Sequence, residues 1–147
     1  MNDFALLLLE DSEEDIFLFR RAVSKSGRAV ALHSVRNGLD AQQHLAGEGK
    51  FADRSEFPLP AVIFCDLQLP GMSGLQFLEW LRQQPALRSR PCVIYSGSAN
   101  PSDVQAAYDS GVTSFIVKPI DFHEWVSRLE IVLKFWMDIA QRPMLEC

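Results

Sequence analysis

The sequence predicts an α/β fold in which a five-stranded parallel sheet carries helices on both faces. Short apolar runs alternate five times with segments whose apolar residues recur at helical spacing. The runs are apolar throughout, which is typical of parallel strands buried on both faces. With 147 residues, the chain has the usual size of one domain. We therefore expect a single domain over residues 1–147, with its core at about residues 5–140 and a short tail at 141–147.

The first two strand–helix units are expected at residues 5–9, 13–26, 29–34 and 39–46. Ile16 and Phe19 share one face of the first helix. Asp11 or Ser12 can cap the start of that helix, and Gly27 can end it. The run at 29–34 is the weakest of the predicted strands.

The second half of the chain continues the alternation after a long polar loop at residues 47–60. Further strands are expected at residues 61–65, 91–95 and 113–117, and further helices at 74–83, 101–110 and 122–140. Pro101 suits the first turn of its helix, and Asp121 can cap the last helix. Right-handed crossovers between parallel strands then place helices on both faces of the sheet.

Composition excludes several classes of protein. The net charge is −5 and the basic residues are scattered, so no cationic stripe is available for nucleic acid. The opening apolar run is too short for a membrane span or a secretory signal. Three cysteines without a Cys-x-x-Cys pair do not form a disulfide or zinc pattern, which indicates a reducing cytoplasm.

Polar residues gather where the predicted strands end, and ligands of parallel α/β sheets bind beyond the carboxyl ends of the strands. These residues are Glu10, Asp11, Asp66, Ser96, Gly97 and Lys118. Each alone has an ordinary explanation as a helix cap, a turn or a surface residue. Together they place three carboxylates, a hydroxyl and an ammonium group at one edge of the sheet. Such an edge suits Mg²⁺ and a phosphate, with Asp66 as the nucleophile.

At these residues the sequence resembles the receiver domains of response regulators. The resemblance covers about residues 5–140, and its most specific segment is DLQLPGMSG at residues 66–74. The segment LLLLED at residues 6–11, the pair Ser96-Gly97 and the pair Lys118-Pro119 match as well. The resemblance implies a flavodoxin-like fold of five strand–helix units and a phosphoacceptor role in a two-component system. It also implies a regulator that is not a turnover enzyme. We expect no DNA-binding output domain, because only a short tail follows Ala140.

The resemblance also implies a role for each matching residue. Asp66 would be phosphorylated by a histidine kinase, while Lys118, Ser96 and Gly97 would contact the phosphoryl group. The Mg²⁺ ligands would be Asp11, Asp66, Glu10 through water, and the carbonyl of Gln68. Ser96 and Phe115 would form the switch, although Phe115 lacks the hydroxyl of the tyrosine that the family often carries there. The bond before Pro119 would be cis.

The long loop before the third strand and the aromatic ending at residues 135–140 look like the small regulators that partner bacterial phytochromes. A light-sensing kinase is therefore a candidate partner, and output would pass to a downstream protein or phosphotransfer partner.

The last predicted helix carries two neighbouring apolar stripes, and a surface helix needs only one. One stripe, which includes Phe122, is expected to face the core. The other contains Trp125, Val132, Phe135 and Ile139. We expect this second stripe to form a homodimer interface, and the alternative is a wide core stripe with the tail packed on it.

Three other classes of protein fit the sequence less well. A haloacid-dehalogenase-like phosphatase would carry a second acid at Gln68, and an FMN-binding protein would carry a phosphate loop after the first strand. A degenerate receiver would lack some of the site residues. His33, His44 and His123 show no ligand spacing, and Cys65 is expected to face the core.

Overall fold

The computed structural model describes residues 4–143, which form one five-stranded parallel sheet in the order β2-β1-β3-β4-β5. The strands are β1 (Phe4–Leu9), β2 (Val30–Val35), β3 (Val62–Asp66), β4 (Cys92–Ser96) and β5 (Ser114–Val117). The predicted fold class is confirmed, and each strand begins and ends within one residue of its expected position.

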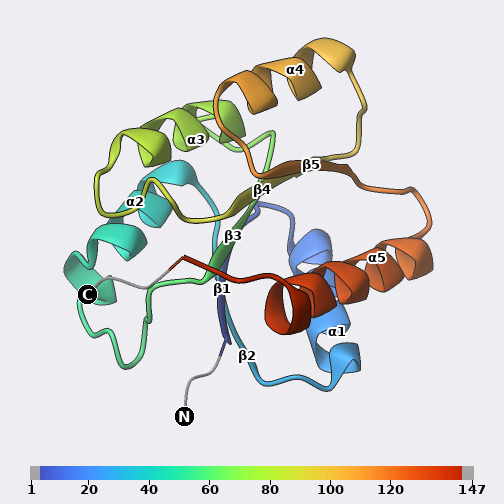
Figure 1. Cartoon of the computed structure of the whole chain (residues 1–147), viewed down its shortest axis with the longest axis horizontal. Coiled ribbons are helices and arrows are strands. Elements are labelled where there is room, and N and C mark those ends of the chain that lie inside the picture. The colour runs from blue at the N-terminus through green and yellow to red at the C-terminus, as the bar shows by residue number, and fades with distance from the viewer. Residues whose placement is uncertain (1–3, 144–147) are drawn as a thin grey trace.

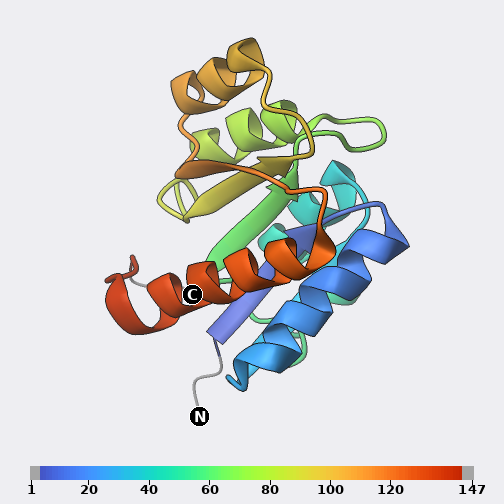
Figure 2. The same ribbon diagram turned by 90° about the vertical axis from the view of Figure 1, so that its right-hand side faces the viewer.

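Five α-helices cover the two faces of this sheet. They are α1 (Glu13–Ser26), α2 (Gly38–Ala46), α3 (Gly74–Gln83), α4 (Pro101–Asp109) and α5 (Phe122–Lys134). Helices α2, α3 and α4 lie on one face and α1 and α5 on the other (Figure 1). Figure 2 shows α1 and α5 side by side on the same face of the sheet. In the part of the chain that the structure describes, no helix has the length and apolar character needed to cross a membrane.

The core has two layers because successive strand residues point to opposite faces. In β1, Leu7 and Leu9 face the side of α2 and α3, while Leu6 and Leu8 face the side of α1 and α5. Cys65 is fully buried in the first layer, as its position in the strand predicts. Cys65 and Cys92 are free thiols, and Cys147 and the last residues of the tail lie outside the described residues.

Capping interactions decide where the helices begin. Of the two candidates before α1, Ser12 is the cap, since its hydroxyl accepts the N–H of Asp15. Gly27 ends the same helix in a left-handed conformation, as expected. Asp121 caps α5 by accepting the N–H of His123.

The loop at residues 47–60 is more ordered than its composition indicates. It contains a short 3-10 helix, η1 (Gly49–Phe51), whose Phe51 is buried. Arg54 fixes the loop against the end of α2 by donating to the carbonyls of His44, Leu45 and Phe57.

The last predicted helix consists of α5 and a following π-helix, η2 (Phe135–Ile139). The expected interface stripe on it is wrong at Trp125, which is only 1% exposed and therefore not available to a second chain. Val132 is partly buried and packs against the core. Phe135 and Ile139 are exposed, at 45% and 63%, as the prediction requires. Phe122, which was expected in the core, is exposed instead.

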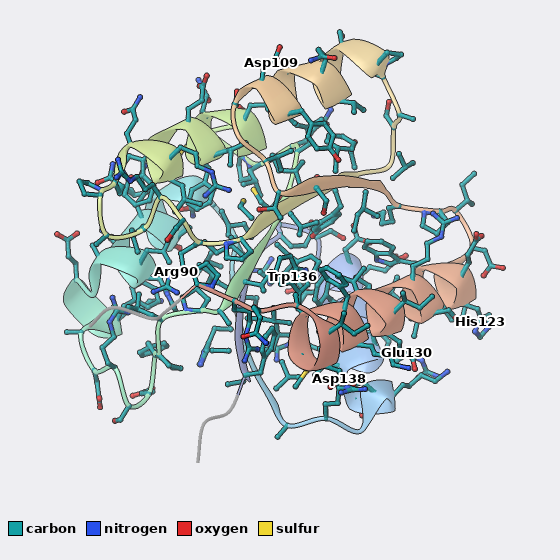
Figure 3. The ribbon with its side chains drawn as sticks, viewed as in Figure 1. Arg90, Asp109, His123, Glu130, Trp136 and Asp138 are labelled. Carbon is teal, nitrogen blue, oxygen red and sulfur yellow. The ribbon has the colours of Figure 1, made fainter. Side chains whose placement is uncertain are left out.

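Trp125 is buried and Phe122 is exposed because the contact of α5 with the sheet and with α1 decides which side of the helix faces the core. Trp125, Leu129 and Leu133 follow one another at four-residue spacing and are all buried. Figure 3 shows Trp136 directed inward and His123 at the outer end of α5. An ion pair between Arg28 and Asp138 joins η2 to the segment after α1.

Candidate functional site

Two carboxylates meet at the carboxyl ends of β1 and β3. Leu9 and Cys65 are paired in the sheet, so Glu10 and Asp66 leave their strands side by side. Glu10 is only 1% exposed, and Glu10 and Asp66 are close enough for each to influence the pKa of the other. Its Oε2 accepts the N–H of Ser12 at 2.9 Å. The two acids that the sequence selected from separate strands are thus neighbours at one edge of the sheet.

Asp66 is half-buried and therefore open to solvent. Its Oδ1 accepts the backbone N–H of Gln68 at 3.1 Å. The loop after it closes tightly, because Gly74 donates to the carbonyl of Leu67 at 2.9 Å. A Cβ atom at Gly74 would lie 2.5 Å from the carbonyl oxygen of Asp66, so only glycine fits there.

The electrostatics of this carboxyl pair favour a cation. Burial raises the pKa of Glu10, and the charge of Asp66 raises it further. Burial also raises the pKa of Asp66, although the Gln68 N–H and the charge of Lys118 act in the other direction. A positive ion between the two groups would relieve both effects.

Lys118 is not paired directly with Asp66. Its Nζ lies 2.6 Å from Oδ2 of Asp15, and both side chains of this ion pair are largely sheltered. The charge of Lys118 nevertheless acts against the burial that raises the pKa of Asp66, so it favours the ionised form of that carboxyl group. Asp15 was not selected from the sequence. The available signal was its position in the first turn of the helix that directly follows β1, close to the carboxyl end of that strand.

Ser96 and Gly97 lie at the end of β4, where they were expected. Ser96 is buried, its hydroxyl accepts the N–H of Ser98 at 3.2 Å, and its carbonyl accepts the N–H of Lys118 at 2.7 Å. Gly97 is exposed, and a Cβ atom there would meet nothing within 4 Å. The space beside it is open toward solvent.

The predicted metal ligands are only partly assembled. Asp11 and Gln68 are exposed, and across residues 4–143 no three Asp, Glu, His or Cys side chains stand close enough to hold one metal ion. Like-charged carboxylates repel one another, which favours an Asp11 side chain in solvent. The donor chemistry nevertheless fits a hard divalent cation, because every predicted ligand atom is an oxygen.

Phe115, the residue predicted to act as a switch, is partly buried. Phe115 packs against the core layer beneath α3 and α4, and its backbone N–H donates to the hydroxyl of Tyr108 at 3.2 Å.

The expected cis bond before Pro119 is wrong, because residues 4–143 contain no cis peptide bond. The following Ile120 is fully exposed, so the turn opens to solvent and accommodates the trans isomer, which is favoured by about 0.5–1 kcal/mol.

Tyr95 is a site residue that the sequence analysis missed. Its hydroxyl donates to Oε1 of Glu10 at 2.5 Å from a buried position on β4. Within an apolar run it resembles an ordinary core aromatic residue. Only the distance of its hydroxyl from Glu10 distinguishes it from one.

Comparison with known proteins agrees with this geometry. The family model for the response regulator receiver domain matches residues 6–130. Response regulator Rcp1 of Synechocystis sp. is 29% identical over 138 residues, which cover 94% of this chain and 92% of Rcp1. An Mn²⁺-bound structure of Rcp1 superimposes with a TM-score of 0.86 at 28% identity, covering 96% of this chain and 99% of that chain.

Two further similar structures are response regulators whose names link them to phytochromes. The phosphorylated cyanobacterial phytochrome response regulator RcpA is 29% identical with a TM-score of 0.90, covering 97% of this chain and 100% of that chain. The bacteriophytochrome response regulator RtBRR is 34% identical with a TM-score of 0.75, and the match covers 99% of this chain and 84% of RtBRR. From the match over residues 6–130, this chain belongs to the receiver domains of the response regulators of two-component signalling.

Proposed function

We propose that a histidine kinase phosphorylates this chain on Asp66. The observation that carries the proposal is the half-buried Asp66 carboxylate, which lies beside buried Glu10 and within the field of Lys118. Phosphoryl transfer requires mainly positioning and neutralisation of charge, and these groups supply both. The chain takes up one phosphoryl group and loses it slowly, so it is not a turnover enzyme.

The transfer itself is a displacement at phosphorus. An Oδ atom of Asp66 attacks, the O–P bond forms as the N–P bond to the kinase histidine breaks, and the electron pair stays on the imidazole. Lys118 moves from Asp15 to one oxygen of the new phosphoryl group. The Ser96 hydroxyl donates to a second oxygen, and the open space beside Gly97 accommodates the third. The charge that is added, about −1.5 to −2, then moves the Ser96 loop and Phe115.

Mg²⁺ is the cofactor that the oxygen donors fit best. Glu10 through water, Asp11, Asp66 and the carbonyl of Gln68 would hold it. When bound, it neutralises charge between the carboxylates and the incoming phosphoryl group. The Mn²⁺-bound form of Rcp1 supports this assignment.

The partners follow from the relatives and from the exposed surface. The phytochrome-linked names of RcpA and RtBRR support a bacteriophytochrome kinase in the cytoplasm as the donor. Exposed Phe135 and Ile139 support a homodimer, and the output passes to a downstream protein or phosphotransfer partner.

The direct test is labelling of Asp66→Asn by radioactive acetyl phosphate with Mg²⁺. We expect the label to be lost in this variant and retained in Asp109→Asn, a matched exposed acid on α4. Undiminished labelling of Asp66→Asn would move the acceptor to another residue.

A further inference from the structure

The side chain of Tyr95 is held rigidly beneath the carboxyl pair. Tyr95 pairs with Asp66 across β3 and β4, so both side chains point to the face covered by α1 and α5. Its ring centroid lies 5.6 Å from that of Trp125 and 6.4 Å from that of Phe19. With 2% of its surface exposed, the ring has no room to change rotamer, so its hydroxyl is fixed in place.

That hydroxyl is one of two fixed hydrogen-bond donors to the carboxyl group of Glu10. Tyr95 donates to Oε1 at 2.5 Å and the Ser12 N–H donates to Oε2 at 2.9 Å, so each carboxyl oxygen has one fixed donor. A carboxylate has about four acceptor positions, so each oxygen keeps one position free. The plane of the carboxyl group is thereby set, with its free positions available to the site.

The backbone of Tyr95 also fixes the main chain next to Asp66. The carbonyl of Tyr95 accepts the N–H of Leu67, the residue directly after Asp66, at 2.9 Å. A single residue of β4 therefore fixes the side chain of Glu10 and the main chain beside Asp66. Nothing in the packing of a core aromatic residue requires a hydroxyl at this point, since Phe would fill the same volume.

We propose that Tyr95 is a positioning residue for the divalent cation site, acting through Glu10. This inference builds on the proposed function, in which Glu10 contacts the cation through a bound water. Such a contact requires the carboxyl plane to be held, and the Tyr95 hydroxyl holds it. Loss of an outer hydrogen-bonding partner of a metal ligand typically weakens metal binding by about 10–100-fold. We expect a loss of about tenfold, since Glu10 keeps its second donor.

The test is the affinity for Mn²⁺, with free ion counted by electron paramagnetic resonance and Mg²⁺ as competitor. Tyr95→Phe should bind both ions about tenfold more weakly than the natural chain. Tyr108→Phe is the matched control, because it removes the hydroxyl of the other tyrosine, which contacts Phe115 and not the carboxylates. Its affinity should stay within about twofold of the natural chain.

A double-mutant cycle separates positioning from a purely structural role. In a Glu10→Gln background, Tyr95→Phe should cause no further loss of affinity, because it acts only through Glu10. A Tyr95→Phe variant that melts at a lower temperature but binds Mn²⁺ with unchanged affinity would overturn the inference. So would a tenfold loss that persists in the Glu10→Gln background. A natural chain that binds neither ion would instead contradict the proposed function.

Discussion

In the proposed function, the ion pair between Lys118 and Asp15 limits access of the lysine to a phosphoryl group on Asp66. The two charges are 2.6 Å apart and largely sheltered, so the pair must open before Lys118 reaches a phosphoryl group on Asp66. Opening it costs on the order of 1 kcal/mol for a pair of this kind.

Replacing Asp15 should therefore speed phosphorylation. In Asp15→Asn the lysine is freed and one negative charge near Asp66 is removed, and both changes favour an anionic donor. We expect acetyl phosphate to label this variant about fivefold faster, which corresponds to about 1 kcal/mol. Glu14→Gln, in the same turn but exposed, should label at the natural rate. Equal or slower labelling of Asp15→Asn would show that the pair does not restrain Lys118.

His44 should make stability depend on pH. It is buried, neither ring nitrogen has a hydrogen-bond partner among residues 4–143, and burial lowers its pKa to about 4. The folded chain keeps this ring neutral while the unfolded chain protonates it near its ordinary pKa of 6.5. The stability from neutral His44 is complete above pH 6.5 and is lost as the pH falls toward 4.

The size of the effect follows from the pKa difference. Between pH 7.5 and pH 5, His44 should cost about 2 kcal/mol of the free energy of unfolding. In urea titrations at both pH values, the free energy of unfolding of His44→Leu should fall by about 2 kcal/mol less than that of the natural chain. His123→Leu, at the exposed end of α5, is the control and should fall as the natural chain does. An equal fall in all three chains would place the pH dependence elsewhere.

At the scale of elements, the turn between β3 and α3 depends on Gly74. A methyl group there would lie 2.5 Å from the Asp66 carbonyl oxygen and 2.9 Å from Cα of Leu67, both backbone atoms that cannot move aside cheaply. Gly74→Ala should lower the free energy of unfolding by about 1–3 kcal/mol through overpacking. Gly97→Ala, where the space is open, should change it by less than about 0.5 kcal/mol in the same urea titration. Similar losses in both variants would contradict the close approach.

The elements themselves were largely predictable from the sequence, because continuous apolar runs and capping residues are local signals. Strand ends were found to within one residue, and Gly27 ended its helix as expected. The errors came from tertiary packing. The burial of Trp125 depends on how α5 crosses the sheet, and the partner of Lys118 depends on where α1 places Asp15. The site residues at the strand ends followed from topology, whereas Tyr95 required a side-chain distance.

At the scale of the whole molecule, we predict a dimer that forms through the exposed apolar residues of η2. Phe135 and Ile139 are both exposed apolar side chains, and such residues favour an interface. Replacing both by Ser should shift the chain from dimer to monomer in light scattering. Leu39→Ser removes an equally exposed apolar residue from α2, on the opposite face of the sheet, and should leave the dimer intact. A natural chain that is monomeric at high concentration, with or without phosphate, would reject this interface.

The proposed function of the whole molecule depends on one covalent event, the phosphorylation of Asp66 at the edge of the sheet. The most direct test is to treat the natural chain with acetyl phosphate and Mg²⁺ and to locate the added group by mass spectrometry of its peptides. The account predicts one phosphoryl group per chain, on Asp66, and none when Mg²⁺ is chelated. A phosphoryl group on any other residue, or equal labelling without the metal, would contradict it.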